Sequence, residues 1–353
     1  MWISGPEEGE PLGSGSAVMT TRTPRPSPSF SSPLASSLQR FLEGKRAAGY
    51  RYDTEAEALG LLDRFLESHV APDDPVISFD VIRDFVARRG HESDTTRGHR
   101  LSLIRQVCRF LALEQPRTAV PGPRFLPIVH RRFLARVLSR EEGRRFLQAC
   151  QAVPSAPWSP LRPTTLGTAL VLLYLTGLRA GEALRLTDAD VDLAVGVLRI
   201  HDTKFGKSRC VPVAADVAAH LRRCRAVVVA GHLDSRLPDA PFFPTAAGRR
   251  YSISALRAAF HQVLDAADIP RRSGGHSLRL HDLRHSFVAL RLLLWYEQGV
   301  DLNARLPILA TYVGHVGLSS SQRYLQLTLD MVGEVTRRHA ARFGHLITER
   351  SAE

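Results

Sequence analysis

The chain has 353 residues, a length that allows two domains, each with its own buried core. Its formal net charge is +12 at pH 7 and 44% of its residues are hydrophobic, which indicates a folded protein with a polyanionic partner, because clustered cations release counterions from nucleic acid; generic stickiness is the alternative. No transmembrane run or signal peptide is visible. The cysteines lack the spacing of a zinc site or a disulfide framework, which fits a protein of a reducing compartment. We interpret them as small residues of the protein core: Cys108, Cys150, Cys210 and Cys224.

The N-terminal part predicts a tail followed by a helical bundle. Residues 1–30 are rich in Gly, Pro, Ser and Thr and are expected to be disordered, because they bury too little apolar area. Between residues 31 and 115, apolar residues recur at helical spacing in four stretches, within 34–42, 59–66, 81–85 and 104–111. Arg97 and Arg100 stand near the start of the fourth helix, which we place at Thr95-Thr96, and are predicted to contact phosphate. A solvated basic face is the alternative.

The rest of the chain predicts a linker and a second, mostly helical domain. Residues 116–137 hold four prolines and five arginines without periodicity, which is typical of a linker along an acidic partner. In residues 138–353 we expect a helix from Ser139 and a buried helix over 165–176 that ends at Gly177. A β-hairpin of 197–201 and 210–213 turns at Gly206, helices follow over 281–298 and 301–313, and a last one begins near 329. The fold class is therefore mainly α with a small β-hairpin.

Two segments of the second domain offer cations at tight turns. In TGLRAGE, residues 176–182, a glycine ends one helix and Gly181 lies near the start of the next, so Arg179 stands at a turn where its planar fork could bind two phosphate oxygens. In TKFGK, residues 203–207, Lys204 or Lys207 at the hairpin tip could protonate a departing sugar oxygen. An exposed turn arginine and a solvated turn lysine are the structural alternatives.

Two further segments add imidazoles and a phenol. In HDLRH, residues 281–285, His281 shares a helix face with Arg284 or His285. The two histidines also have metal-ligand spacing, so zinc and a metal phosphohydrolase are alternatives, although the further ligands that they need are not evident. Gly314 releases the chain from a helix before His315, and nine residues later Tyr324 follows a possible helix cap at 319–321.

Together these segments resemble the tyrosine recombinase (phage integrase) family. The resemblance spans residues 33–345 and presents, in chain order, the arginine of TGLRAGE, a hairpin lysine, HxxRH, GH and a tyrosine. It implies that the tyrosine attacks a DNA phosphate while two arginines hold its oxygens, a lysine protonates the leaving oxygen and two histidines help to move the tyrosine proton. In that order these residues are Tyr324, Arg179 and Arg284, Lys204, and His281 and His315.

The resemblance also implies the supporting parts. Glu182 would orient a neighbouring histidine, and the DNA contacts would include Arg97, Arg100, Lys207 and Arg209. The helical bundle matches the family's core-binding domain, and the C-terminal helix would dock on a neighbouring subunit in a tetramer on paired double-stranded DNA sites, with partner recombinases a further possibility. No cofactor or metal is implied, and the expected location is the cytoplasm of a bacterium, at the nucleoid.

The sequence departs from the family pattern in two places, and the first of them concerns the element type. The long stretch between Arg284 and His315 is similar to recombinases of transposons and multi-recombinase mobile elements, and Leu325-Gln326 replaces the usual Thr-His after the tyrosine. Two other functions remain open from the residues: a non-catalytic DNA-binding relative acting as a regulator or accessory subunit, and a type IB topoisomerase.

Overall fold

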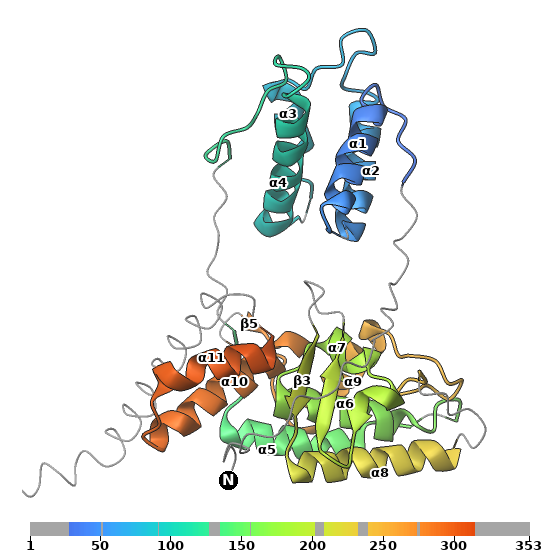
Figure 1. Ribbon diagram of the computed structural model, residues 1–353, viewed down its shortest axis with the longest axis vertical. Helices are drawn as coiled ribbons and strands as arrows, with labels where there is room; N and C mark the ends of the chain where they lie inside the picture. Colours follow the sequence, from blue (N-terminus) through green and yellow to red (C-terminus); the bar gives the residue numbers. More distant parts are fainter. Residues whose placement is uncertain are drawn as a thin grey trace, which may run out of the picture. The chain divides into compact units, whose positions relative to one another are not determined.

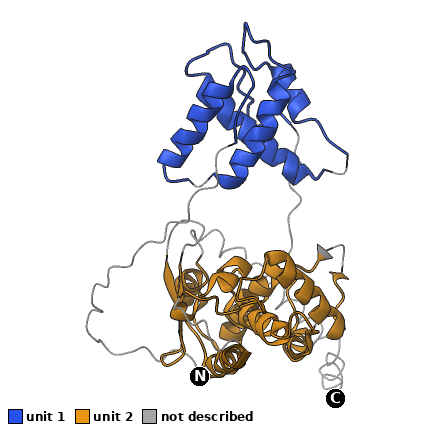
Figure 2. Cartoon of the chain, turned by 90° about the vertical axis from the view of Figure 1, so that its right-hand side faces the viewer, with its two compact units in different colours: residues 1–132 blue, residues 133–353 orange. Residues whose placement is uncertain are grey.

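Two separate units make up the computed structural model, residues 1–132 and 133–353 (Figure 2). The structure describes residues 28–50, 52–90, 92–126, 135–155, 157–201, 208–231, 239–273 and 276–314. No helix within them is both long enough and apolar enough to cross a membrane.

The described part of unit 1 contains four helices: α1 (Ala35–Ala47), α2 (Asp53–Leu66), α3 (Phe79–Phe85) and α4 (Asp94–Leu111) (Figure 1). Their apolar stripes face one another, as the helical spacing predicts, because burial of such a stripe is the main source of helix stability in a small bundle. The fully buried side chains of this core include Leu38, Leu42, Leu59, Leu62, Ile82, Ile104 and Val107.

Serine side chains begin the two later helices of unit 1. Ser78 Oγ accepts a hydrogen bond from the backbone N–H of Val81 at the start of α3. The start of α4 was predicted two residues too late, since Ser93 Oγ accepts from the N–H of Thr96 at 3.2 Å and thereby extends the helix.

The helices of unit 2 gather around α6 (Arg162–Thr176), which is buried along most of its length. It contacts α7 (Ala180–Arg185), α8 (Ala215–Gly231), α9 (Ile253–Ala266) and α10 (Leu280–Glu297). The first described helix of the unit is α5 (Arg140–Ala149), which begins after Ser139 as expected and is followed by a 3₁₀ turn, Cys150–Ala152. Ser139 and Glu142 form a capping box at its start. No helix was predicted from the sequence for the stretches that form α8 and α9.

A small antiparallel sheet follows α7 after a 3₁₀ turn, Asp188–Asp190. Its order is β1 (Val191–Asp192), β2 (Val197–Ile200) and β3 (Arg209–Pro212), and a second pair consists of β4 (Arg272–Ser273) and β5 (His276–Ser277). Together with the helices, these strands confirm the predicted fold class and the hairpin. The register pairs Cys210 with Arg199 on the solvent face, so our interpretation of Cys210 as a core residue was wrong, whereas the other three cysteines are buried.

The last described helices, α10 and α11 (Leu302–Val313), lie side by side (Figure 1). They share a small apolar cluster of Phe287, Val288, Leu292, Leu306, Leu309 and Val313. Gly314 ends α11 with φ +72°, as the predicted glycine stop requires.

Candidate catalytic site

The turn after α6 is fixed by the absence of a side chain at Gly177. This residue has φ +64°, and its N–H donates to the carbonyl of Leu173. A Cβ at this position would lie 2.6 Å from Cδ1 of Phe287, so α10 packs directly on the turn. The chain therefore leaves α6 against α10 and delivers Arg179 to the first position before α7.

Arg179 is held along one edge of its guanidinium. Its Nη1 donates to Oε1 of Glu182 at 2.7 Å, and its Nη2 donates to the carbonyl oxygen of Gly314 at 3.0 Å. The side chain nevertheless remains 30% exposed. A guanidinium that is already oriented loses less conformational entropy when it binds an anion, so this geometry suits an oxyanion ligand.

Glu182 is the buried centre of this arrangement, with a side chain only 1% exposed. It accepts from the backbone N–H of Arg179 at 2.9 Å and from both Nη atoms of Arg209, at 3.1 and 2.9 Å. Burial alone would raise the pKa of Glu182, but the hydrogen bonds from Arg209 and Arg179 outweigh it and lower the pKa to about 2. The carboxylate is therefore ionised throughout the neutral range.

Among the described residues, the partners of Glu182 are two arginines and no histidine. The predicted orientation of a histidine by Glu182 stays a prediction for His315, which lies outside the described residues. Arg209 was predicted to contact DNA, but it is only 10% exposed and its fork is occupied by Glu182. In the DNA-free structure Arg209 therefore belongs to an internal ion pair, and its predicted contact with DNA stays a prediction. The sequence signal was available, because Arg209 shares a strand face with the fully buried Val211.

The start of α10 carries the HDLRH segment. The fully buried Asp282 accepts from the N–H of Arg279 at 2.7 Å and so caps the helix. Two residues later Arg284, which is 2% exposed, donates from Nη1 to the carbonyl of Gly177 at 2.8 Å. A phosphate can reach this guanidinium only after local opening, whereas Arg179 is accessible in the present arrangement.

His281 is exposed and lies in the first turn of the same helix. Its ring meets that of His285 edge-on, with centroids 4.7 Å apart. The side of the ring that faces the protein is shielded from water, and this desolvation, followed by the positive charges of His285, Arg284 and Arg279, lowers the pKa of His281 to about 4. The residue as a whole keeps solvent access, so a neutral imidazole stands at the surface of the site at neutral pH.

Four described segments therefore meet at one place: the turn after α6, Arg209 of β3, the start of α10 and the end of α11. Arg284 holds the turn that bears Arg179, and Arg179 in turn holds Gly314, the residue before His315. The predicted site residues Lys204, Lys207, His315 and Tyr324 lie outside the described residues, and their roles stay predictions. The Gly314 carbonyl, as a partner of Arg179, was not predicted from the sequence, since no side-chain pattern announces a backbone acceptor.

The arginines of α4 have structural partners in unit 1. Arg100 donates to the carbonyls of Phe85 and Ala87 at 2.7 and 2.9 Å and pairs with Glu92, and Arg97 donates to the carbonyl of Val86 at 2.8 Å. These carbonyls belong to the end of α3, where free acceptors need donors. In the DNA-free structure Arg97 and Arg100 therefore stabilise the end of α3, and their predicted contact with phosphate stays a prediction.

The described residues offer no obvious metal centre. Among them, no group of three His, Cys, Asp or Glu side chains gathers where an ion could be held. The zinc alternative for His281 and His285 therefore finds no third ligand in this part of the chain.

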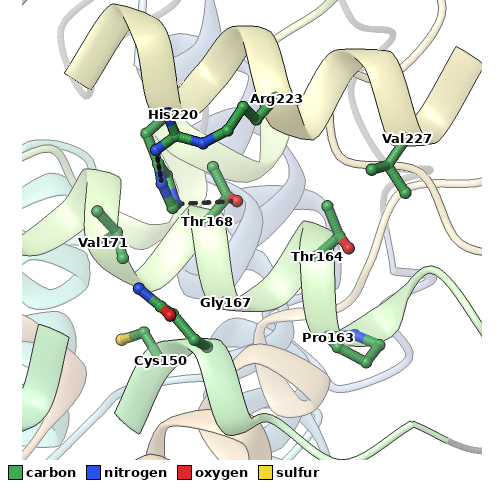
Figure 3. Close-up of a pocket in the computed structure, with 10 residues that line it drawn as sticks. Cys150, Pro163, Thr164, Gly167, Thr168, Val171, His220, Arg223 and Val227 are labelled. Carbon is green, nitrogen blue, oxygen red and sulfur yellow. Dashed lines mark hydrogen bonds between the residues drawn. The ribbon is translucent and has the colours of Figure 1, made fainter. Parts of the chain in front are cut away.

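A separate hollow of about 210 Å³ opens near the other end of α6, between α6 and α8 (Figure 3). There His220 lies 3.3 Å from Oγ1 of Thr168 and 3.2 Å from Nη2 of Arg223. Because arginine only donates, Nδ1 of His220 accepts and its Nε2 carries the proton. Burial, followed by the charge of Arg223, lowers the pKa of His220. None of the residues lining the hollow belongs to the predicted motifs, so it lies apart from the candidate site.

Comparison with known proteins places these observations in a family. Residues 136–330 match the Phage integrase family. The chain is 33% identical over 308 residues to a putative integrase/recombinase, y4rE, of Sinorhizobium fredii, which covers 86% of this chain and 95% of the relative. It is also 34% identical over 215 residues to the tyrosine recombinase XerC of Rhodospirillum centenum, covering 60% of this chain and 57% of that protein.

Solved structures share the fold. The Tn1549 transposon integrase in complex with circular intermediate DNA has a TM-score of 0.57 and 16% identity, covering 82% of this chain and 94% of that one. XerH bound to a palindromic difH substrate has a TM-score of 0.55 and 18% identity, with 73% and 70% covered. The chain belongs to the phage integrase family. It is thus a tyrosine recombinase, an enzyme that breaks and rejoins DNA strands.

Proposed function

We propose that this enzyme is a site-specific recombinase of a mobile element, in which Tyr324 attacks the scissile phosphate. The phenol oxygen forms a bond to phosphorus, the bond to the 5′-oxygen breaks, and Lys204 gives that oxygen a proton. The products are a 3′-phosphotyrosyl link and a free 5′-hydroxyl. Attack of a new 5′-hydroxyl reverses the step, so rejoining needs no external energy source.

The observation that carries this proposal is the convergence of Arg179 and Arg284 at one turn. Two guanidinium groups at one turn can stabilise the charge that grows on the non-bridging oxygens. Arg179 is positioned for direct contact, and Arg284 braces the turn and joins the phosphate when the site opens. Because the pKa of His281 is lowered, this imidazole is neutral near pH 7 and can accept the proton that the tyrosine loses. His315 would act beside it.

The proposed partner is double-stranded DNA, bound by both units. The solved structures named above are complexes of XerH and of the Tn1549 integrase with DNA. The net charge of +12 suits the same partner. We assign residues 31–115 as the core-binding domain, 116–137 as a basic linker and 138–353 as the catalytic domain, whose C-terminal helix docks on a neighbour in a tetrameric synapse.

The mobile-element context rests on the relatives. Putative integrase/recombinases y4rE, y4rB and y4rC, all of one Sinorhizobium fredii strain, are 33%, 33% and 28% identical to this chain. Several similar recombinases in one organism support the proposal that this enzyme works with related recombinases on one element.

The decisive experiment is a suicide-substrate assay with nicked DNA from the ends of the element that encodes this gene. The wild-type enzyme is expected to form a covalent adduct that maps to Tyr324, in the presence of EDTA as well. Tyr324→Phe should bind the DNA equally and form no adduct, whereas Tyr296→Phe, at an exposed tyrosine of α10, should behave as wild type. An adduct in Tyr324→Phe refutes the nucleophile, and an enzyme that binds without any adduct is the non-catalytic relative.

The same assay tests the arginine. Arg179→Ala is expected to slow adduct formation by about a hundredfold or more, by analogy with the loss of an oxyanion-hole donor. Unchanged cleavage by this variant would contradict its role. Relaxation of any supercoiled plasmid by the monomeric enzyme would instead indicate a topoisomerase.

A further inference from the structure

We propose that Arg209 is a positioning residue of the reaction: it neutralises Glu182, so that the charge of Arg179 remains available to the phosphate, and it fixes the end of α11 beside Arg179. This inference rests on the proposed function, because it concerns how the same site is assembled.

All three guanidinium nitrogens of Arg209 donate hydrogen bonds inside the protein. Its two Nη atoms reach the two carboxylate oxygens of Glu182 at 3.1 and 2.9 Å, and its Nε donates to the carbonyl of Tyr312 at 2.9 Å. The planar fork of arginine makes such a paired contact together with a third hydrogen bond, and the single ammonium of lysine cannot reproduce it. Arg209 therefore ties β3 to both α7 and α11.

The contacts close into a ring. Glu182 accepts from Nη1 of Arg179, and Nη2 of Arg179 donates to the carbonyl of Gly314. Gly314 lies against the guanidinium of Arg209, since a Cβ there would stand 2.8 Å from Nη1 of that arginine. A side chain at position 314 would thus displace the guanidinium of Arg209. The φ of +72° at Gly314 favours glycine as well.

The charges in the ring explain why two arginines share one carboxylate. Two guanidinium groups and one carboxylate leave one net positive charge, and the exposed member is Arg179 rather than Arg209. Without Arg209, the buried carboxylate of Glu182 would be compensated by Arg179 alone, and the positive charge that faces the phosphate would be largely cancelled.

Two residues of this ring are also close in the sequence to other predicted site residues. Arg209 lies five residues after Lys204, and Gly314 immediately precedes His315. Loss of these contacts would therefore free both Arg179 and Gly314, the residue after which the chain continues to the proposed nucleophile.

The test compares full-length wild type, Arg209→Met, Arg209→Lys and Gly314→Ala in single-turnover cleavage of the nicked suicide substrate at saturating protein. Arg199→Met is the matched control, because Arg199 lies on the same hairpin in an exposed pair with Asp192. Arg209→Met is expected to cleave about tenfold or more slowly with little change in DNA Kd, and Arg209→Lys should recover part of the loss. Gly314→Ala should show the same selective defect.

A second substrate separates electrostatics from simple structural damage. If a neutral methylphosphonate replaces the scissile phosphate, less positive charge is needed, so the gap between Arg209→Met and wild type should shrink. Equal cleavage by wild type and Arg209→Met, a loss confined to DNA binding, or an unchanged gap on the methylphosphonate would each overturn the inference. Should Arg209→Met fail to fold, the same comparisons are made with Arg209→Lys and Gly314→Ala, and the same outcomes decide. Absence of any wild-type adduct would instead refute the proposed function itself.

Discussion

Replacement of Glu182 by glutamine tests the centre of the site through stability. The pKa of this carboxyl falls from the ordinary 4.5 to about 2, which corresponds to about 3 kcal/mol of preference for the ionised form in the folded protein. The residue is almost fully buried, so solvent screening takes little from this value. Glu182→Gln also leaves Arg209 without a charged partner, and loss of one member of a buried ion pair costs about 3–5 kcal/mol. We therefore expect a loss of about 3 kcal/mol at pH 7.

The pH dependence gives this prediction a sign. A carboxyl whose pKa is depressed by folding contributes stability that is fully present above its unfolded pKa and is lost as the pH falls through the folded value. The difference between wild type and Glu182→Gln should therefore be complete at pH 7 and should shrink from about pH 4.5 towards pH 2.

Tryptophan fluorescence during urea unfolding provides the measurement. Trp158 and Trp295 both belong to unit 2, and the described part of unit 1 contains no tryptophan. The control is Glu141→Gln, because Glu141 forms an exposed pair with Arg144 and should contribute less than about 1 kcal/mol. If Glu182→Gln is no less stable than this control at pH 7, the reasoning about the buried network is wrong.

Two further substitutions test the turn after α6 and the structural role of Arg100 in unit 1. Gly177→Ala should lower the free energy of unfolding by about 1–2 kcal/mol because of its left-handed backbone, and by about 1–3 kcal/mol more because its Cβ displaces Phe287. Gly299→Ala, which has a similar φ but open space around it, should show only the first loss in the same urea assay. Equal losses in the two variants would contradict the contact with α10. Arg100→Ala should lower the protection of α3 in amide hydrogen exchange by about 2 kcal/mol, because two carbonyls lose their donors. The control Arg83→Ala, at an exposed arginine, should leave this protection unchanged. Unchanged protection together with weakened DNA binding by Arg100→Ala would instead support the predicted phosphate contact.

The local elements were predictable because their signals are local. Apolar residues at helical spacing mark the stripes that α1 to α4 bury, and Gly177 and Gly314 mark helix ends where only a left-handed conformation continues the chain. The capping box at Ser139 is a similar case. The helices α8 and α9 carry comparable spacing, for example Leu256, Phe260 and Val263 on α9, so they too were within reach of the sequence although they were not predicted.

The partners of charged groups were far less predictable. Arg100 and Arg179 look alike in the sequence, since both are arginines near a helix start, yet one holds the end of α3 and the other presents an open edge beside Gly314. The difference arises from backbone carbonyls, which every residue has and which no side-chain pattern locates. Cys210 was misassigned for a related reason, because the face of a strand depends on register.

By itself, then, the sequence determined the family, the fold class and the order of the polar segments, because these follow from residue types and spacing along the chain. Only the tertiary structure decided that Glu182 serves two arginines, that Arg209 is internal, and that Arg284 and Arg179 grip the backbone at Gly177 and Gly314 across more than one hundred residues. Such contacts depend on which distant carbonyls and carboxylates are left without water when the helices pack, and this is a property of the folded chain as a whole.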